Sequence, residues 1–307
     1  MRDTFVRVLT NLVKNDSSIV LLTADLGFGV FDEFASLFPQ NYVNVGISEQ
    51  NMASMAAGMA MEGAKVFAYS IGNFPTLRAL EQIRSDIAYH NANVKIVSVG
   101  AGFSYGPLGM SHHATEDIAI MRAIPEIDVY VPGCLWEVEQ ITNFMGSNSG
   151  PAYLRLDKSH AGDTSLPGES FEYGKMRTII QGKEVAVLCC GGILTEGMAA
   201  ARSLEDKGIS TSVVSVPFIC PLDEESIKRI VREHKLVVTV EEHLRNGGLG
   251  SAVLEVCGDS DKFPVKHIRI GLASKFETVV GTQKYLRTLN GLSSEIISKT
   301  VLNYLER

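Results

Sequence analysis

Short apolar strands that alternate with helical segments constrain the fold more than any other feature of this sequence. Strand-like runs occur at residues 18–22, 42–45, 66–70, 94–99, 127–132 and 152–156. Helical patterns lie at residues 4–14, 52–61, 77–88 and 135–145. Because buried strands joined by helices pair in parallel, this order predicts a mostly parallel sheet covered on both faces.

The same alternation starts again in the second half of the chain. Strand-like runs recur at residues 185–190, 211–217, 236–240 and 266–270, after a polar segment punctuated by Gly and Pro. We therefore expect two doubly wound α/β domains. The first covers residues 1–165, a linker covers 166–182, and a smaller C-terminal α/β domain covers 183–307.

Composition narrows the class of protein. The chain has 307 residues, of which 45% are hydrophobic and 21% charged, as in soluble globular proteins. Its net charge of −7 provides no basic field for nucleic acid or an anionic membrane, and no apolar run is long enough to span a membrane. Five scattered cysteines without metal-ligand spacing indicate reduced thiols. We expect a cytoplasmic protein.

The stretch V-G-I-S-E-Q-N-M at residues 45–52 is the first that points to chemistry. A strand ends at Gly46, Ser48 is a good helix N-cap, and residues 52–61 are nearly all Ala, Met and Gly. Small residues on every side predict a helix that is buried all round. Glu49 would then be a buried carboxylate, which either complements the helix dipole or has a functional task.

A long Gly-rich loop at residues 100–113 is the second such stretch, and it ends in His112 and His113. It is compatible with a plain surface loop. A shared metal site is disfavoured, since adjacent histidines point apart. Further candidates follow other strands, where the open end of a parallel sheet gathers functional residues: Asp25, Phe74 and Arg155. From the sequence alone, Phe74 is equally compatible with a core position, and Arg155 and Arg2 with surface cations.

In order along the chain, these stretches resemble the transketolase family, which includes 1-deoxyxylulose-5-phosphate synthases and the beta subunits of 2-oxo acid dehydrogenases. G-I-S-E-Q at 46–50 resembles the family's "G-I-A-E-Q". G-M-S-H at 109–112 matches the first four positions of "G-P-T-H-Q-P-I-E". E-E-H at 241–243 and G-G-L-G at 247–250 resemble the C-terminal domain's "E-E-x…G-G-x-G". The resemblance covers the pyrimidine-binding and C-terminal domains, and thus nearly the whole chain.

The resemblance implies how this chain would hold thiamine diphosphate. Glu49 falls on the glutamate that bonds a ring nitrogen of the aminopyrimidine and so activates the cofactor. Phe74 matches the aromatic residue that stacks on that ring. Asp25 corresponds to the "A-D-L" aspartate near the cofactor and the dimer contact.

The resemblance also implies residues that meet the substrate. His112 would approach the donor sugar, where it could bond hydroxyls or relay a proton. Arg155 falls on the arginine that meets the substrate phosphate, and Arg2 is a second candidate. No role follows for Arg78 or His113.

The family's metal loop, "Gly-Asp-Gly…Asn", does not occur in this sequence. Gly-Asp pairs occur at 162–163 and 258–259, and neither is followed by Gly. We therefore expect an N-terminal partner subunit that holds the diphosphate and Mg²⁺ or another divalent ion, with no metal on this chain. We expect a heterotetramer built on a homodimer of this chain, and no activity from this chain alone.

The implied reaction is transfer of a two-carbon ketol unit from a ketose to an aldose. Gly29, Gly100 and Leu108 stand where sugar-phosphate transketolases have serine, histidine and aspartate. A sugar phosphate, a sulfo-sugar or a deoxy sugar therefore all remain compatible. The alternatives are an activity like that of 1-deoxyxylulose-phosphate synthase or a 2-oxo acid dehydrogenase beta subunit, and, in another class, a non-catalytic stabilising or regulatory subunit.

Overall fold

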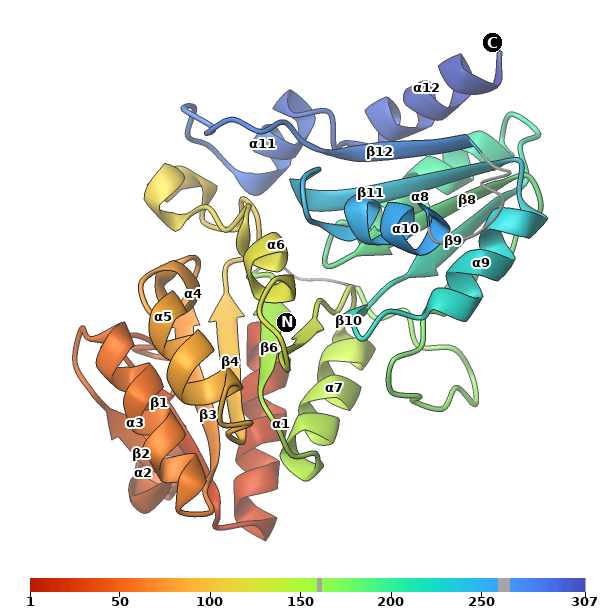
Figure 1. Cartoon of the computed structure of the whole chain (residues 1–307). Coiled ribbons are helices and arrows are strands. Elements are labelled where there is room, and N and C mark those ends of the chain that lie inside the picture. Colours follow the sequence, from red (N-terminus) through yellow and green to blue (C-terminus); the bar gives the residue numbers. More distant parts are fainter. Residues whose placement is uncertain (159–161, 259–265, 307) are drawn as a thin grey trace.

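The first domain is built on a seven-stranded sheet in which six strands run parallel. The computed structural model describes residues 1–158, 162–258 and 266–306. In spatial order the strands are β10 (Phe218–Cys220), β5 (Asp128–Tyr130), β6 (Ala152–Leu156), β4 (Val94–Val99), β3 (Lys65–Ile71), β1 (Ile19–Thr23) and β2 (Tyr42–Asn44). The second domain packs above its carboxyl edge (Figure 1). The predicted fold class is confirmed.

Helices cover both faces of this sheet. One face packs against α1 (Arg2–Asn15), α2 (Asp32–Leu37) and α7 (Leu135–Ser147). The other packs against α3 (Glu49–Met61), α4 (Phe74–Leu77), α5 (Leu80–Gln82), a π-helix (Ile83–Ala88) and α6 (Asp117–Arg122). Alternate residues of β1 enter the two cores, Leu21 on one side and Leu22 on the other. All five residues of β1 are buried, which explains its unbroken apolar sequence.

The second domain has a five-stranded sheet with one antiparallel edge strand. Its order is β12 (Lys266–Leu272), β11 (Leu236–Leu244), β8 (Val185–Cys190), β9 (Thr211–Ser215) and β7 (Arg177–Ile180). Helices α8 (Leu194–Glu205), α11 (Gln283–Leu289) and α12 (Ser294–Leu305) pack on one face. On the other lie α9 (Glu224–Glu233) and α10 (Leu249–Gly258).

The boundary between the domains differs from the expected one in two ways. Strand β7 lies inside the range expected to be linker, so the linker is shorter than expected. Strand β10 follows β9 in the second domain but pairs with β5, and so completes the first sheet. Both are short edge strands, whose pairing depends on a distant neighbour more than on local sequence.

Two helices also differ from expectation. The continuous helix expected over residues 77–88 is broken at Ala79, whose φ of −113° and ψ of 18° are not helical, and it resumes partly as a π-helix. Helix α3 is not buried all round. Met52, Ala53, Ala56 and Ala57 pack on the sheet, while an outer face is exposed and consists of Gln50, Asn51, Ser54, Met55, Gly58 and Met61.

The buried side chain of Arg155 joins the two domains. Arg155 of β6 donates from Nε to Asp117 Oδ2 of α6 at 2.7 Å. Its Nη2 donates to the carbonyl oxygens of Ala114 at 2.8 Å and Glu242 at 3.0 Å, the second from the C-terminal domain. Both side chains of the pair are at most 2% exposed. All three acceptors are thus held by one cation out of water.

We predict that Arg155→Met strongly destabilises the fold, because it leaves the Asp117 carboxylate buried without its cation. Breaking such a pair costs about 3–5 kcal/mol of unfolding free energy. Urea denaturation followed by circular dichroism measures this. Arg7→Met is the matched control, since Arg7 pairs with Glu139 at the surface, and its loss should cost at most about 1 kcal/mol. Equal losses in the two variants would show that the interior pair has no special role.

Candidate active site

The carboxylate of Glu49 lies in the first turn of α3, almost entirely out of water. Glu49 is 4% exposed. Ser48 occupies the N-cap position but does not cap the helix; its Oγ donates to Val45 O at 2.9 Å. The charged partner of Glu49 is Arg78, whose Nη1 donates to Glu49 Oε1 at 3.1 Å. The carboxylate therefore has a cation beside it, as burial requires.

Arg78 also connects Glu49 to two other predicted site residues. Its guanidinium carbon lies 3.9 Å from the centroid of the Phe74 ring. The Phe74 and His112 rings meet edge to face, with centroids 5.1 Å apart. The structure thus brings Glu49, Phe74 and His112 into one group around Arg78.

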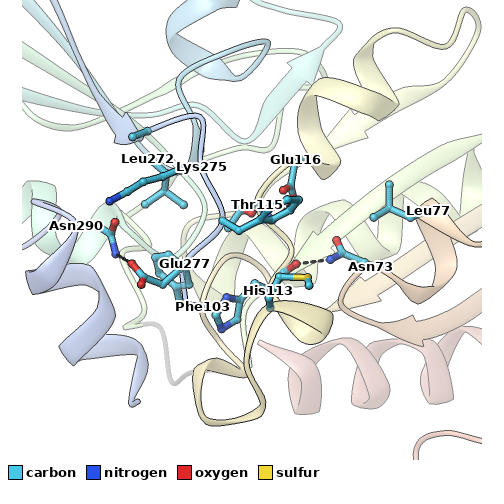
Figure 2. A pocket seen from close by; sticks show the side chains of 13 residues that line it. Asn73, Leu77, Phe103, His113, Thr115, Glu116, Leu272, Lys275, Glu277 and Asn290 are labelled. Atoms are coloured by element: carbon cyan, nitrogen blue, oxygen red, sulfur yellow. Dashed lines mark hydrogen bonds between the residues drawn. The ribbon is translucent and has the colours of Figure 1, made fainter. Parts of the chain in front are cut away.

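Gly72 and Asn73, which directly precede Phe74, fix its position against the histidine loop. Gly72 has a φ of +52°, and a Cβ atom there would lie 2.9 Å from His112 O. Any larger residue would push the loop away. Asn73 donates from Nδ2 to His113 O, which ties the start of α4 to the same loop (Figure 2). The Phe74–His112 contact is therefore held by backbone approach as well as by packing.

The adjacent histidines lie in different environments. His112 contacts Phe74, whereas the buried His113 ring lies 5.0 Å from the Phe103 ring. Burial lowers the pKa of His112, and the positive charge of Arg78 lowers it further. Burial also lowers the pKa of His113. Within the described residues, no group of three or more His, Cys, Asp or Glu side chains is placed to hold a metal ion.

A cavity lies behind this loop, between the two domains. Lys275 and Glu277 reach into it from the segment after β12, opposite Asn73 and Glu116 (Figure 2). Its volume of about 70 Å³ is far below the roughly 300–1,000 Å³ of ordinary small-molecule pockets. This cavity is therefore too small to hold a sugar or a cofactor ring.

Tyr105 and nearby cations form a rim beside His112. A Cβ atom on Gly100 would lie 2.5 Å from the Tyr105 ring, so that ring fills the space a side chain at 100 would need. The Tyr105 and His112 centroids are 6.4 Å apart, and Lys158 Nζ lies 4.8 Å from the Tyr105 centroid. Burial raises the pKa of Tyr105, while the charge of Arg2 lowers it. Lys158 and Arg2 thus both act on Tyr105; Arg2 also pairs with Asp3 at 2.9 Å.

Comparison with known families matches both halves of the chain. Residues 1–163 match the model "Transketolase, pyrimidine binding domain", and residues 174–297 match "Transketolase, C-terminal domain". The chain belongs to the transketolase family. The expected family and fold are confirmed, and membership implies dependence on thiamine diphosphate.

Relatives with separate subunits match this chain over nearly their full length. A putative transketolase C-terminal section from Methanocaldococcus jannaschii is 37% identical, over 100% of this chain and 96% of the relative. One of the subunits of an apulose-4-phosphate transketolase from Actinobacillus succinogenes is 34% identical, over 95% of this chain and 94% of the relative. A solved "split gene transketolase, inactive beta4 tetramer" is 34% identical, with a TM-score of 0.90 over 98% of this chain and 97% of that one.

Three predicted residues of this transketolase-family chain lie outside the group around Glu49: Arg2, which acts on Tyr105, and Asp25 and Arg155. Asp25, at the end of β1 with a φ of +56°, exchanges hydrogen bonds with Asn44 at 2.9 and 3.1 Å. Arg155 is buried in the ion pair with Asp117. Its guanidinium is enclosed and bonded within the protein, and its expected contact with a substrate phosphate stays a prediction.

Sequence reasoning assigned no role to Arg78, Tyr105 or Lys158. The spacing of Phe74 and Arg78 was a usable signal, since residues four apart meet on one helix face and a guanidinium stacks well on an aromatic ring. Lys158 had no local signal: its relation to Tyr105 depends on how the chain after β6 passes the Gly-rich loop.

We predict that His112 titrates below the ordinary pKa of histidine, because it is partly buried and faces the charge of Arg78. Proton NMR of the histidine ring in the isolated chain measures this, with His112→Gln to assign the signal. Added salt should raise the pKa towards the ordinary value, since it screens the Arg78 charge. A pKa at or above that of the unfolded chain would contradict the placement of His112.

Proposed function

We propose that this chain is the pyrimidine-binding subunit of a split transketolase, which transfers a two-carbon ketol unit from a ketose to an aldose. The observation that carries the proposal is the buried carboxylate of Glu49, which Arg78 connects to the face of Phe74, with the His112 ring packed against Phe74. A non-catalytic subunit would need none of these three residues in one group.

The residues present fit the aminopyrimidine of thiamine diphosphate. The planar guanidinium of Arg78 already lies on Phe74 and bonds Glu49, so this space accepts a flat group whose edge meets the Glu49 carboxyl group. When bound, the cofactor would supply the nucleophilic carbon for ketol transfer. Glu49 would hold a proton at a ring nitrogen, and Phe74 would fix the ring plane. His112 would bond the sugar hydroxyls or relay a proton.

We further propose that a second, N-terminal subunit supplies the diphosphate site and a divalent ion. Two apolar side chains near the site are largely exposed, Ile47 at 77% and Phe28 at 75%. They lie in the segments that follow β2 and β1, and exposed apolar groups of this kind suit burial against another subunit. The exposed outer face of α3, with Ser54 and Gly58 at its centre, suits close packing against a second copy of this chain. A heterotetramer follows.

Of the helices described, none has the length and apolar character to cross a membrane, and a cytoplasmic location fits the buried thiols.

An anionic sugar fits the rim beside His112. Lys158 lies over the Tyr105 ring, and Arg2 acts on Tyr105 from another element. Because Arg155 is enclosed, we propose that Lys158 and Arg2 meet the phosphate or sulfonate of the substrate. Both anions present oxygen acceptors to a cation. We therefore expect this rim to favour anionic over neutral sugars and to distinguish little between phosphate and sulfonate.

We predict that Glu49→Gln lowers turnover by about 100-fold to 10,000-fold, the usual contribution of a positioned proton-transfer group. The assay mixes this chain with its N-terminal partner, thiamine diphosphate and Mg²⁺, and follows ketol transfer; each chain alone should be inactive. Unchanged circular dichroism is the folding control. Near-normal turnover in the Glu49→Gln pair would refute the role of Glu49. Decarboxylation of pyruvate without ketol transfer would instead support an activity like that of 1-deoxyxylulose-phosphate synthase or a 2-oxo acid dehydrogenase.

We predict that Lys158→Ala raises KM for an anionic sugar by about tenfold with little change in kcat, because a charge-assisted contact made equally in ground and transition states is lost. Lys299→Ala, an exposed lysine on α12, is the matched control. A neutral sugar should show no change in KM. A fall in kcat alone would point to a different role for Lys158.

A further inference from the structure

Arg78 occupies both surfaces that the aminopyrimidine would need. We propose that Arg78 is an internal placeholder: in the subunit without cofactor its guanidinium takes the position of the pyrimidine ring, and it must leave before thiamine diphosphate binds. This inference rests on the proposed function of Glu49 and Phe74.

The geometry indicates that the Arg78 guanidinium and the aminopyrimidine ring cannot occupy this position together. A guanidinium is planar, carries N–H donors in its plane, and stacks on aromatic faces. Arg78 uses both properties: it donates to Glu49 Oε1 at 3.1 Å and lies 3.9 Å above the Phe74 centroid. An aminopyrimidine is also flat, and its ring nitrogen would bond the same carboxyl group. Two flat groups cannot lie on the same face of one ring and bond the same carboxylate together.

The placeholder has a physical purpose in the free subunit. Glu49 is 4% exposed, and a carboxylate so far out of water is costly unless a cation or several donors face it. Arg78 provides that cation while the cofactor is absent. The charge on Arg78 also lowers the pKa of His112, so it acts on the whole group.

Arg78 is also placed so that it can withdraw. Its side chain is 49% exposed, so the guanidinium has open solvent beside it. It lies at the end of α4, directly before the break at Ala79. A side chain that borders solvent can rotate away without unfolding a helix. The Glu49 side chain, by contrast, is only 5% exposed and has no such route into solvent.

Competition of this kind lowers the apparent affinity for the cofactor, because only the fraction of subunits with Arg78 withdrawn can bind. Removing Arg78 should therefore tighten binding. A partly exposed ion pair and a cation–π contact are each worth a modest amount, which together correspond to about a tenfold change in Kd.

The test titrates thiamine diphosphate with Mg²⁺ into the assembled pair by calorimetry, for wild type, Arg78→Ala, Arg78→Lys and Arg84→Ala. Arg84 is an exposed arginine six residues along, in the π-helix, and serves as the matched control. We expect about tenfold tighter binding for Arg78→Ala. Arg78→Lys should lie between it and wild type, because lysine keeps the charge but not the planar stack. Arg84→Ala should match wild type.

A second measurement needs neither cofactor nor partner. In the isolated chain, Arg78→Ala should raise the pKa of His112, measured by NMR titration, while Arg84→Ala leaves it unchanged. An unchanged His112 pKa in Arg78→Ala would show that Arg78 does not lie in the group, and would overturn the proposal.

The outcomes separate the two proposals. Equal or weaker cofactor binding by Arg78→Ala, with wild type binding normally, overturns the placeholder and leaves the proposed function intact; it would mean that Arg78 helps to hold the cofactor. Absence of binding by the wild-type pair overturns both.

Discussion

The burial of one carboxylate is the constraint around which this site is arranged. Glu49 begins a helix whose inner face packs on the sheet, so its side chain has little access to water. Ser48 directs its hydroxyl back to Val45, and Arg78 therefore provides the charged contact. The position of Arg78 in turn fixes what lies on Phe74, and Phe74 meets His112. One desolvated charge thus organises residues from three separate segments.

The frame that holds these segments depends on a second buried charge. Arg155 bonds Asp117, Ala114 O and Glu242 O, and so connects α6, the histidine loop and the C-terminal domain. Asp117 accepts a further bond from Tyr153 at 2.6 Å. Such a network is costly to break but leaves no freedom for a ligand. The same chemistry that would suit Arg155 to a phosphate suits it to this interior role.

Local sequence predicted the central strands well, because each is a mostly apolar run buried on both faces. It failed where the outcome depends on a distant neighbour. β7 and β10 are three- or four-residue edge strands, and β10 pairs across the domain boundary. The helix break at Ala79 and the exposed outer face of α3 likewise have no local signature.

The site residues likewise divide into those that the sequence could predict and those that depend on distant neighbours. Glu49, Phe74 and His112 lie in stretches that carry a family resemblance, and the structure brings all three together. Arg155 carried the same kind of resemblance, but its partner Asp117 lies 38 residues away in sequence, so its burial could not be foreseen. Tyr105 over Gly100 explains in steric terms why this chain departs from the sugar-phosphate enzymes at that position.

A crystal structure of the assembled pair with thiamine diphosphate would show whether the cofactor ring replaces Arg78. We expect the aminopyrimidine to lie on the Phe74 ring with a ring nitrogen bonded to the Glu49 carboxyl group, and the Arg78 guanidinium to have moved into solvent or onto the partner chain. A cofactor ring bound elsewhere, with the Glu49–Arg78 ion pair and the Arg78–Phe74 stack still in place, would contradict this expectation.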